Sequence, residues 1–187
     1  MPFKTTPFPG LYIFEPTVFE DSRGYFYESY NEKTFQNSDI NYRFVQDNQA
    51  LSSYGVVRGL HFQKPPYAQT KLLRTLQGSI LDLVVDIRKG SPTYKRIFTI
   101  ELSAKNKKQL LVPKGFAHGY SVLTPTAEVF YKCDAFYEKS SEGGISIFDH
   151  SLNIDWQIPK DEMILSEKDQ DYPTLDKIIS PFVYEEA

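Results

Sequence analysis

The sequence predicts a mainly β fold, a barrel or jelly roll of short strands with two short helices. Three observations support this prediction. Short apolar segments recur at regular spacing with turn residues between them, which is typical of sandwiches and barrels. Aromatic residues make up 15% of the chain, and they favour strands. The 187 residues show one composition throughout, so we expect a single domain over residues 1–187.

Strand character is found in ten segments separated by polar turns, and turn signals lie at residues 21–24, 64–66, 77–78, 89–92 and 105–107. In chain order the predicted strands are 11–15, 25–30, 44–50, 56–62, 71–76, 79–86, 95–102, 109–112, 119–123 and 127–133. Residues 80–86 are apolar on both faces of their strand, so we expect a cover on each face. A second subunit is the economical candidate for the outer cover.

Two segments have helical rather than strand character. A short helix is predicted within residues 31–37 and a helical turn within residues 165–169. Ser166 is the predicted N-cap of the second helix, because serine side chains accept hydrogen bonds from free N–H groups at helix starts.

Composition argues against several classes of function. The net charge of −3 lacks the basic footprint of a nucleic-acid-binding protein. The single cysteine, Cys133, permits neither an internal disulfide nor a multi-cysteine zinc site. No segment has the length of a membrane span, and the N-terminus does not read as a signal peptide. We therefore expect a cytoplasmic protein.

Two of the three histidines lie in strand-like segments beside glycines. His118 ends a Pro-x-Gly-x-x-His run that begins at Pro113, the form of the second cupin motif. His61 follows Gly55 at the spacing of the first cupin motif, but Gln63 replaces the second histidine of that motif. Lys71 stands where a glutamate ligand would lie, and a charged ammonium cannot bind a metal. The sequence therefore predicts no metal site, and a basic cavity suited to an anion.

The same cavity is suited to proton transfer. His61 can act as a general base, although an isolated strand histidine is more often structural. Lys71 and His118 can stabilise a developing oxyanion, although a solvated surface is the default for lysine. Tyr131 points inward by strand alternation, as a core aromatic or as a buried phenol that donates a proton. Asp169 can cap a helix from its Ser-x-x-Asp sequence, or orient His61.

Blocks of sequence along nearly the whole chain together match one family. They lie at residues 21–28, 44–48, 57–63, 71, 112–122, 131–133, 142–145, 154–156 and 165–169. In these blocks the chain resembles the dTDP-4-dehydrorhamnose 3,5-epimerases, cofactor-independent enzymes with a cupin-type jelly-roll barrel. The resemblance implies a dTDP-sugar substrate, a homodimer and epimerisation at C3 and C5 of dTDP-4-dehydro-6-deoxy-D-glucose.

The resemblance also implies a role for each matched site residue. His61 resembles the base, oriented by Asp169, and Tyr131 resembles the acid on the opposite face of the sugar. Lys71, with His118 nearby, would stabilise the enolate oxygen. The remaining matched positions would bind the nucleotide and sugar: Arg23, Phe26, Glu28, Gln46, Asn48, Arg58, Tyr137, Glu142 and Lys168.

The chain departs from the usual pattern of the family at three places. Gln49 and Ala50 replace His-Ser, Phe62 replaces a tyrosine, and Ser146 and Ile147 replace Arg-Trp. The closest alternative function is a mono-epimerase that acts at C3 or C5 only. A metal-dependent cupin oxygenase would need a third ligand, and a non-catalytic sugar-nucleotide binder would not need an acid–base pair.

Overall fold

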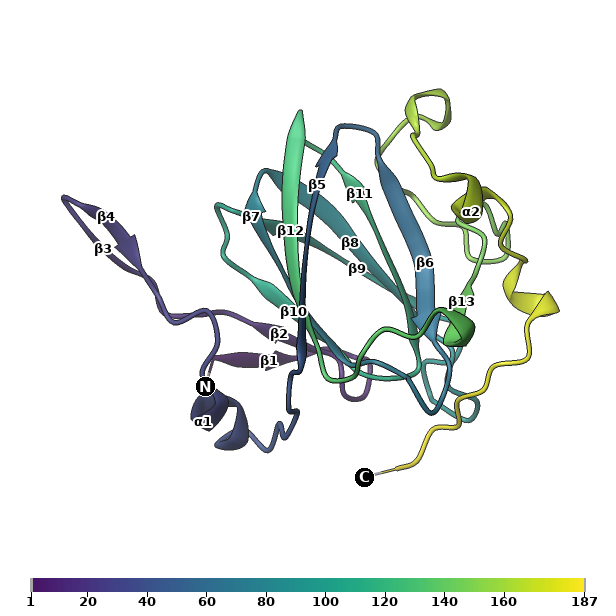
Figure 1. The fold of residues 1–187 in the computed structure, drawn as a ribbon, viewed down its shortest axis with the longest axis horizontal. Helices are drawn as coiled ribbons and strands as arrows, with labels where there is room; N and C mark the ends of the chain where they lie inside the picture. Colours follow the sequence, from purple (N-terminus) through teal and green to yellow (C-terminus); the bar gives the residue numbers. More distant parts are fainter. Residues whose placement is uncertain (1, 187) are drawn as a thin grey trace.

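Two β-sheets face each other in the computed structural model, which describes residues 2–186 (Figure 1). The larger sheet has the strand order β1-β2-β10-β7-β12-β5, and the smaller has the order β13-β6-β11-β8-β9. The pairings within both sheets are antiparallel. The strands of the larger sheet are β1 (Phe3–Thr5), β2 (Tyr12–Phe14), β5 (Gln46–Ser53), β7 (Lys71–Gln77), β10 (Gln109–Val112) and β12 (Thr126–Cys133). Those of the smaller sheet are β6 (Val57–Gln63), β8 (Ser79–Asp86), β9 (Ile97–Ser103), β11 (Phe116–Val122) and β13 (Glu142–Gly144). The mainly β architecture predicted from the sequence is confirmed.

The predicted strands match the observed ones closely inside the barrel. The bounds of β8 and β10 agree with the predictions. Strand β11 begins three residues earlier than predicted, because Phe116, Ala117 and His118 pair with Asp86, Val85 and Val84 of β8. This earlier start places His118 inside a strand, where its direction is fixed.

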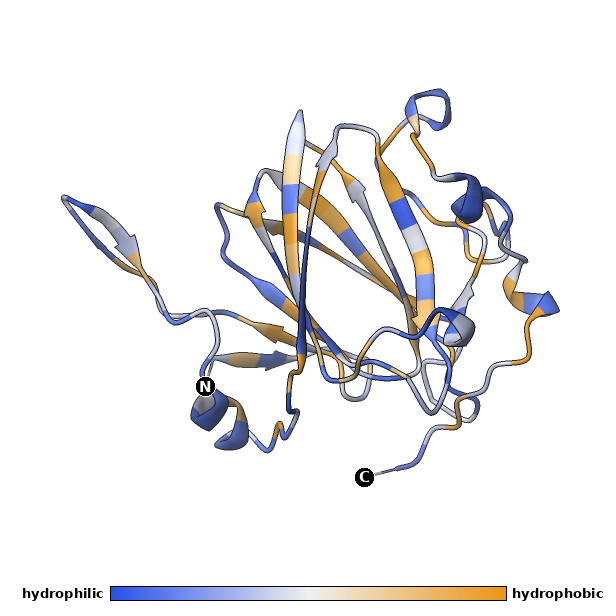
Figure 2. Cartoon of the chain, in the orientation of Figure 1, coloured by the Kyte–Doolittle hydropathy of each residue, from blue (hydrophilic) through white to orange (hydrophobic). Residues whose placement is uncertain are grey.

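The space between the two sheets is filled by an apolar core. Leu73 and Val129 from the larger sheet belong to one buried cluster with Ile80, Val84 and Tyr120 from the smaller sheet. Figure 2 shows that apolar residues line much of the barrel strands, whereas the short helices are hydrophilic. The core fixes the sheets relative to each other, and with them the strands that carry the polar cavity described below.

The outer face of β8 is covered by the same chain, not by a second subunit. Leu83 and Val85 point into a buried cluster with Leu152, Trp156 and Leu175 from the C-terminal part of the chain. All eight residues of β8 are buried, as the apolar pattern predicts. The expected cover on both faces is therefore confirmed, but the choice of a second subunit for this cover was wrong.

Both predicted helices are present with polar caps. Helix α1 spans Glu32–Gln36, and the side chain of Asn31 accepts a hydrogen bond from the backbone N–H of Lys33. Helix α2 spans Glu167–Gln170, and the predicted cap Ser166 accepts from the backbone N–H of Asp169. Single 3-10 turns occur at Lys139–Ser141, Lys160–Glu162 and Leu175–Lys177. Within the described chain, no helix is long and apolar enough to cross a membrane.

A two-stranded arm projects from the barrel (Figure 1). It consists of β3 (Phe19–Asp21) and β4 (Gly24–Phe26), joined by the predicted turn. The strand predicted at residues 25–30 is thus only partly formed. Phe19 and Phe26 are 63% and 69% exposed, so the arm presents two aromatic rings away from the core of its own chain.

Candidate active site

A polar cavity opens between the two sheets, with a volume of about 130 Å³. Strands β5, β7 and β12 of the larger sheet line it on one side, and β6 and β13 of the smaller sheet line it on the other. Its lining residues are Gln46, Asn48, His61, Phe62, Gln63, Gln69, Lys71, Tyr131, Tyr137 and Glu142. An inner chamber of about 10 Å³ shares His61, Lys71 and their neighbours with this cavity and also contains His118. The fold therefore joins residues that are up to 96 positions apart in the chain, from Gln46 to Glu142.

His61 and Asp169 form a short hydrogen-bonded pair. The distance from His61 Nε2 to Asp169 Oδ1 is 2.6 Å, and only 4% of the aspartate side chain is exposed. Burial works to raise the pKa of Asp169, but His61 and hydrogen bonds from Ser166 and the Gly59 backbone hold it below its ordinary value. Because an ionised carboxylate only accepts hydrogen bonds, Nε2 carries the hydrogen. The lone pair of neutral His61 is then on Nδ1, which is free to take a proton.

Tyr131 presents a phenol group to the same cavity. Burial raises the pKa of Tyr131 to about 12, with smaller contributions from Cys133 and Tyr120 and an opposing one from Arg58. The phenol is therefore protonated at neutral pH. Strand alternation predicted the inward direction of this side chain, and the structure confirms it. Tyr131 is thus available as a proton donor.

Lys71 brings a cationic group into the cavity. Burial lowers its pKa, while the Cys133 thiolate, where it forms, and the carboxylates of Asp82 and Glu142 work to raise it. The lysine Nζ lies 5.9 Å from the centre of the Tyr131 ring. An ammonium in a low-dielectric cavity stabilises a nearby oxyanion more strongly than it would in water.

His118 lies deeper and has an aspartate partner of its own. Its Nε2 is 2.9 Å from Asp82 Oδ2, and both side chains are buried. In the described chain, the second carboxylate oxygen of Asp82 has no hydrogen-bond partner. Asp82 is not among the residues predicted from the sequence, although a carboxylate inside the apolar run of β8 is a signal of a buried polar site.

Gln63, at the position of a metal-binding histidine in related motifs, holds two loops together. Its Nε2 donates to the carbonyl oxygens of Tyr67 and Phe136 at 3.0 and 3.3 Å, and its Oε1 accepts from the backbone N–H of Glu138 at 2.9 Å. Within residues 2–186, no three His, Cys, Asp or Glu side chains group as a metal site requires. The amide of Gln63 therefore stabilises the two loops at the cavity mouth by hydrogen bonds to their backbones.

Polar groups and one aromatic ring form the mouth of the cavity. Gln46 accepts a hydrogen bond from the backbone N–H of Tyr137 at 3.0 Å and donates to Asn48 at 3.1 Å. The hydroxyl of Tyr137 donates to Glu142 at 3.3 Å, and Lys168 forms an ion pair with the same carboxylate. The Tyr137 ring is 52% exposed at this rim, so one face is available to a planar ligand.

Six predicted residues do not line the cavity or its inner chamber. Two of them, Lys168 and Asp169, pair with the lining residues Glu142 and His61, and the other four make no such contact. Arg23 and Phe26 are on the projecting arm, and Arg23 pairs with Asp21 at 2.5 Å. Glu28 follows the arm and accepts a hydrogen bond from Asn31. Arg58 donates to Ser52, and its positive charge works to lower the pKa of Tyr131.

Tyr172 contacts the histidine dyad and was not selected from the sequence. Its ring lies edge-on to His61, with 5.7 Å between ring centres. A Cβ at Gly144 would come within 2.5 Å of this ring, so only glycine leaves room for the tyrosine. The two glycines at residues 143–144 were a visible signal of such a close approach.

Comparisons with known proteins agree with this geometry. The family model described as dTDP-4-dehydrorhamnose 3,5-epimerase matches residues 5–177. A dTDP-4-dehydrorhamnose 3,5-epimerase of Shigella flexneri is 50% identical over 165 residues, which cover 88% of this chain and 90% of the relative.

Two solved structures illustrate the range of similar proteins. A dTDP-6-deoxy-D-glucose-3,5-epimerase from Legionella pneumophila, in complex with dTDP-4-keto-L-rhamnose, aligns with a TM-score of 0.93 at 41% identity and covers 98% of each chain. A 3'-monoepimerase from Streptomyces bikiniensis, in complex with dTDP-quinovose, aligns with a TM-score of 0.84 at 30% identity. That alignment covers 91% of this chain and 86% of the monoepimerase. The cupin-type barrel expected from the sequence is confirmed by these likenesses.

Proposed function

The chain belongs to the dTDP-4-dehydrorhamnose 3,5-epimerase family, and we propose on this premise that it epimerises C3 and C5 of dTDP-4-dehydro-6-deoxy-D-glucose. The product is dTDP-4-dehydro-L-rhamnose. The observation that carries the proposal is the meeting of the His61–Asp169 pair, Tyr131 and Lys71 at one cavity. These groups are the base, the acid and the anion-stabilising cation that the reaction needs.

Proton abstraction is the first step of the proposed mechanism. The C4 ketone acidifies the C–H bonds at C3 and C5, and Nδ1 of His61 removes one of these protons. The electron pair of the broken C–H bond forms an enolate whose negative charge lies on the C4 oxygen. Asp169 stabilises the imidazolium by accepting from Nε2–H at 2.6 Å.

Lys71 and His118 stabilise the enolate oxygen, where negative charge develops in the transition state. Tyr131 then donates its phenolic proton to the opposite face of the same carbon, which inverts the configuration. His61 then releases its proton to solvent and the Tyr131 phenolate takes one up, after which the cycle is repeated at the second carbon. Because substrate and product are isomers, electrons and atoms balance without an oxidant or a cofactor.

The mouth residues are proposed to bind the dTDP part of the substrate. Tyr137 stacks on the thymine ring, and Arg58 and Lys168 interact with the diphosphate. The polar side chains of Gln46, Asn48 and Glu142 hydrogen-bond with nucleotide and sugar. The hydrogen bonds that link Gln46, Asn48, Tyr137 and Glu142 around the mouth support the assignment of these four residues. The role proposed for Arg58 rests on the resemblance to the family.

We propose a homodimer in which the arm of one subunit completes the site of its partner. Arg23 and Phe26 are exposed and face away from their own cavity, and strand β5 is a free edge of the larger sheet in the described chain. A test is to mix the inactive variants Arg23→Ala and His61→Ala. If the arm acts on the partner, a mixed dimer regains one complete site and its activity returns. If the arm acts within its own subunit, activity stays lost.

We further propose that residues 1–187 form a single domain and that the reaction takes place in the cytoplasm. One cooperative calorimetric transition would support the single domain. Fractionation of cells that express the protein would test its location, and recovery with the cytoplasmic fraction is the expected result.

The decisive experiment follows deuterium into each carbon. The protein is incubated with dTDP-4-dehydro-6-deoxy-D-glucose in D₂O without added metal or NAD(P), and NMR reads C3 and C5 separately. Incorporation at both carbons supports the proposal. Incorporation at one carbon supports a mono-epimerase, the alternative favoured by the likeness to the Streptomyces bikiniensis enzyme. No incorporation would overturn both, and His61→Ala provides the inactive control.

A further inference from the structure

A segment near the C-terminus, residues 180–184, reaches the inner end of the candidate active site. Phe182 is 8% exposed and lines the inner chamber together with His61, Lys71 and His118. Its ring packs edge-to-face against Phe62, with 6.1 Å between ring centres. The chamber that holds the proposed enolate-stabilising groups is thus bounded on one side by two apolar rings.

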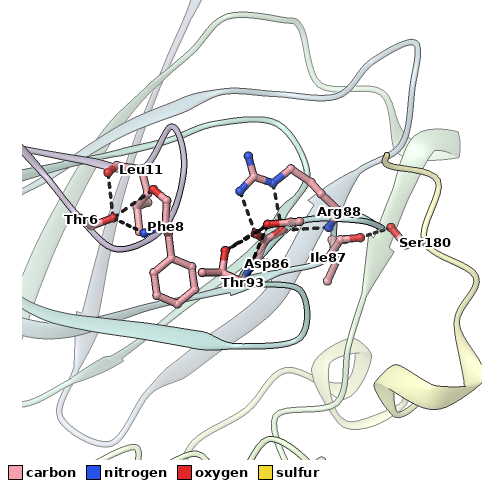
Figure 3. A network of polar contacts seen from close by, with 9 residues as sticks. Thr6, Phe8, Leu11, Asp86, Ile87, Arg88, Thr93 and Ser180 are labelled. Carbon is pink, nitrogen blue, oxygen red and sulfur yellow. Dashed lines mark hydrogen bonds and ion pairs between the residues drawn. The ribbon is translucent and has the colours of Figure 1, made fainter. Parts of the chain in front are cut away.

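Residues 180–184, which we name the C-terminal strap, are held by a small set of contacts. The backbone N–H of Lys89 donates to the Phe182 carbonyl at 3.0 Å, and the N–H of Tyr184 donates to the Lys89 carbonyl at 2.8 Å. The Ser180 hydroxyl donates to the Ile87 carbonyl (Figure 3). Within the described residues, the strap forms a single bridge and no regular strand.

A buried ion pair anchors the strap to the end of β8. Arg88 donates twice to Asp86, at 2.9 and 2.8 Å, as Figure 3 shows. The guanidinium lies 4.4 Å from the centre of the Phe116 ring and 5.2 Å from that of Tyr184. A bidentate pair of this kind has a fixed geometry, so Asp86 at the end of β8 holds the guanidinium in the place where it contacts Tyr184 of the strap.

Gly115 shows how closely this anchor packs against the histidine motif. It has a φ of +88°, and a Cβ there would lie 2.4 Å from Arg88 Cγ and 3.4 Å from Phe182 Cβ. The glycine of the Pro-x-Gly-x-x-His run is therefore required by the strap and its anchor, independently of any ligand.

We propose that the C-terminal strap is a positioning element of the reaction, in which Phe182 seals the inner chamber against bulk water and so keeps Lys71 in a low-dielectric environment. The role of Lys71 in this inference rests on the proposed function. A dry chamber strengthens the interaction of the ammonium with an enolate, because competing water dipoles are excluded.

The charges that face Lys71 come from several elements. Asp82 on β8, Cys133 on β12 and Glu142 on β13 raise its pKa, and His61, His118 and Tyr131 share the cavity. Burial lowers its pKa more than these charges raise it. Replacing Phe182 by a smaller side chain admits water and leaves the charges in place, so the pKa of Lys71 rises toward its ordinary value.

The test measures Lys71 directly in the full chain. Lysine labelled with ¹³C at Cε is titrated by NMR in wild type, Phe182→Ala, Phe182→Leu and Leu175→Ala, and Lys71→Met assigns the resonance. Leu175 is a matched control, because it is 3% exposed in the same apolar cluster as Phe182 but does not line the chamber. We expect an upward shift in Phe182→Ala, little shift in Phe182→Leu and none in Leu175→Ala.

Activity gives a second readout. We expect kcat of Phe182→Ala to fall roughly tenfold with little change in KM, because the nucleotide-binding mouth is untouched. An unchanged Lys71 pKa in a folded Phe182→Ala protein would overturn the inference. If that variant does not fold, Tyr184→Ala loosens the strap from Arg88 without removing a core side chain, and its Lys71 pKa must rise for the inference to stand. Absence of wild-type turnover would instead overturn the proposed function, since the NMR titration does not depend on activity.

Discussion

The two histidine–aspartate pairs share their chemistry but differ in their surroundings. His61 is on β6, 29% of its side chain is exposed, and its partner Asp169 comes from α2. His118 is on β11, 8% of its side chain is exposed, and its partner Asp82 is on the adjacent strand β8. His61 lines the open cavity as well as the inner chamber, whereas His118 lines the inner chamber only.

This difference separates a base from a supporting group. A base must reach the substrate and exchange its proton with solvent, which the partly exposed His61 can do. A buried pair is better suited to holding a fixed charge distribution, because its desolvated groups have few alternative partners. The identity of the residue alone therefore does not fix its role. The distance from solvent and the element that carries the partner decide between the two.

The largest effect on activity is expected when each histidine–aspartate pair is broken in turn by substitution of its histidine. His61→Ala should lower kcat by about 10²–10⁴-fold, because it removes the general base. His118→Ala should lower kcat less, by about 10-fold to 100-fold, because Lys71 still stabilises the enolate. The unfolding free energy of His118→Ala should fall by about 3–5 kcal/mol, more than that of His61→Ala, because Asp82 is left buried without its partner. Steady-state kinetics and urea unfolding measure both quantities, and equal kinetic losses would contradict the assignment.

The next prediction, for Tyr131→Phe, distinguishes removal of the substrate proton from its return to the opposite face of the sugar. Tyr131→Phe removes the proposed acid and leaves His61–Asp169 intact, so product formation should fall about 10²-fold or more. Exchange of substrate protons with D₂O should persist, because His61 can return a deuteron to the face from which it took the proton. NMR of the recovered sugar distinguishes labelled substrate from product. Loss of exchange together with turnover would show that Tyr131 is needed for abstraction itself.

A smaller effect concerns the charge of Asp82 acting on Lys71. The Asp82 carboxylate is one of the charges that raise the pKa of Lys71 against the lowering by burial. Asp82→Asn removes that charge, so the pKa of Lys71 should fall further. The alkaline limb of the kcat profile should then move to lower pH, since the ammonium is lost sooner as pH rises. Glu128→Gln, which alters a carboxylate outside the cavity, is the matched control and should leave the limb in place.

The sequence predicted the long strands of the barrel better than the short strands of the arm and of the sheet edges. Ser79–Asp86 and Gln109–Val112 were predicted with the observed bounds, because buried apolar runs between clear turns have few alternatives. Strands β1, β3 and β13 were missed, since each has three residues and no periodicity to detect.

The site could be predicted in part from the residues and in part only from the resemblance. Alternation along β12 predicted the inward direction of Tyr131. The pairing of His61 with Asp169 spans 108 positions and crosses from a strand to a helix, which no local pattern encodes. Phe182 was missed because burial against a distant segment gives it its role. Asp82 and Tyr172 left only indirect signals, a carboxylate within an apolar strand and a pair of glycines that leave room for a ring.

The smallest expected effect is on stability in acid and concerns the His61–Asp169 pair. The pKa of Asp169 lies below its ordinary value, so its ionisation stabilises the fold above the unfolded-state pKa of about 3.9, and this contribution is lost as pH falls through the folded pKa. Asp169→Asn should therefore cost about 1 kcal/mol of unfolding free energy at pH 7 and less as the pH approaches 3. Urea unfolding from pH 3 to pH 7 measures the difference. A cost that is constant with pH would mean that Asp169 stabilises the fold through packing rather than through its charge. That result would contradict the assignment of an ionised Asp169 that keeps the proton of His61 on Nε2.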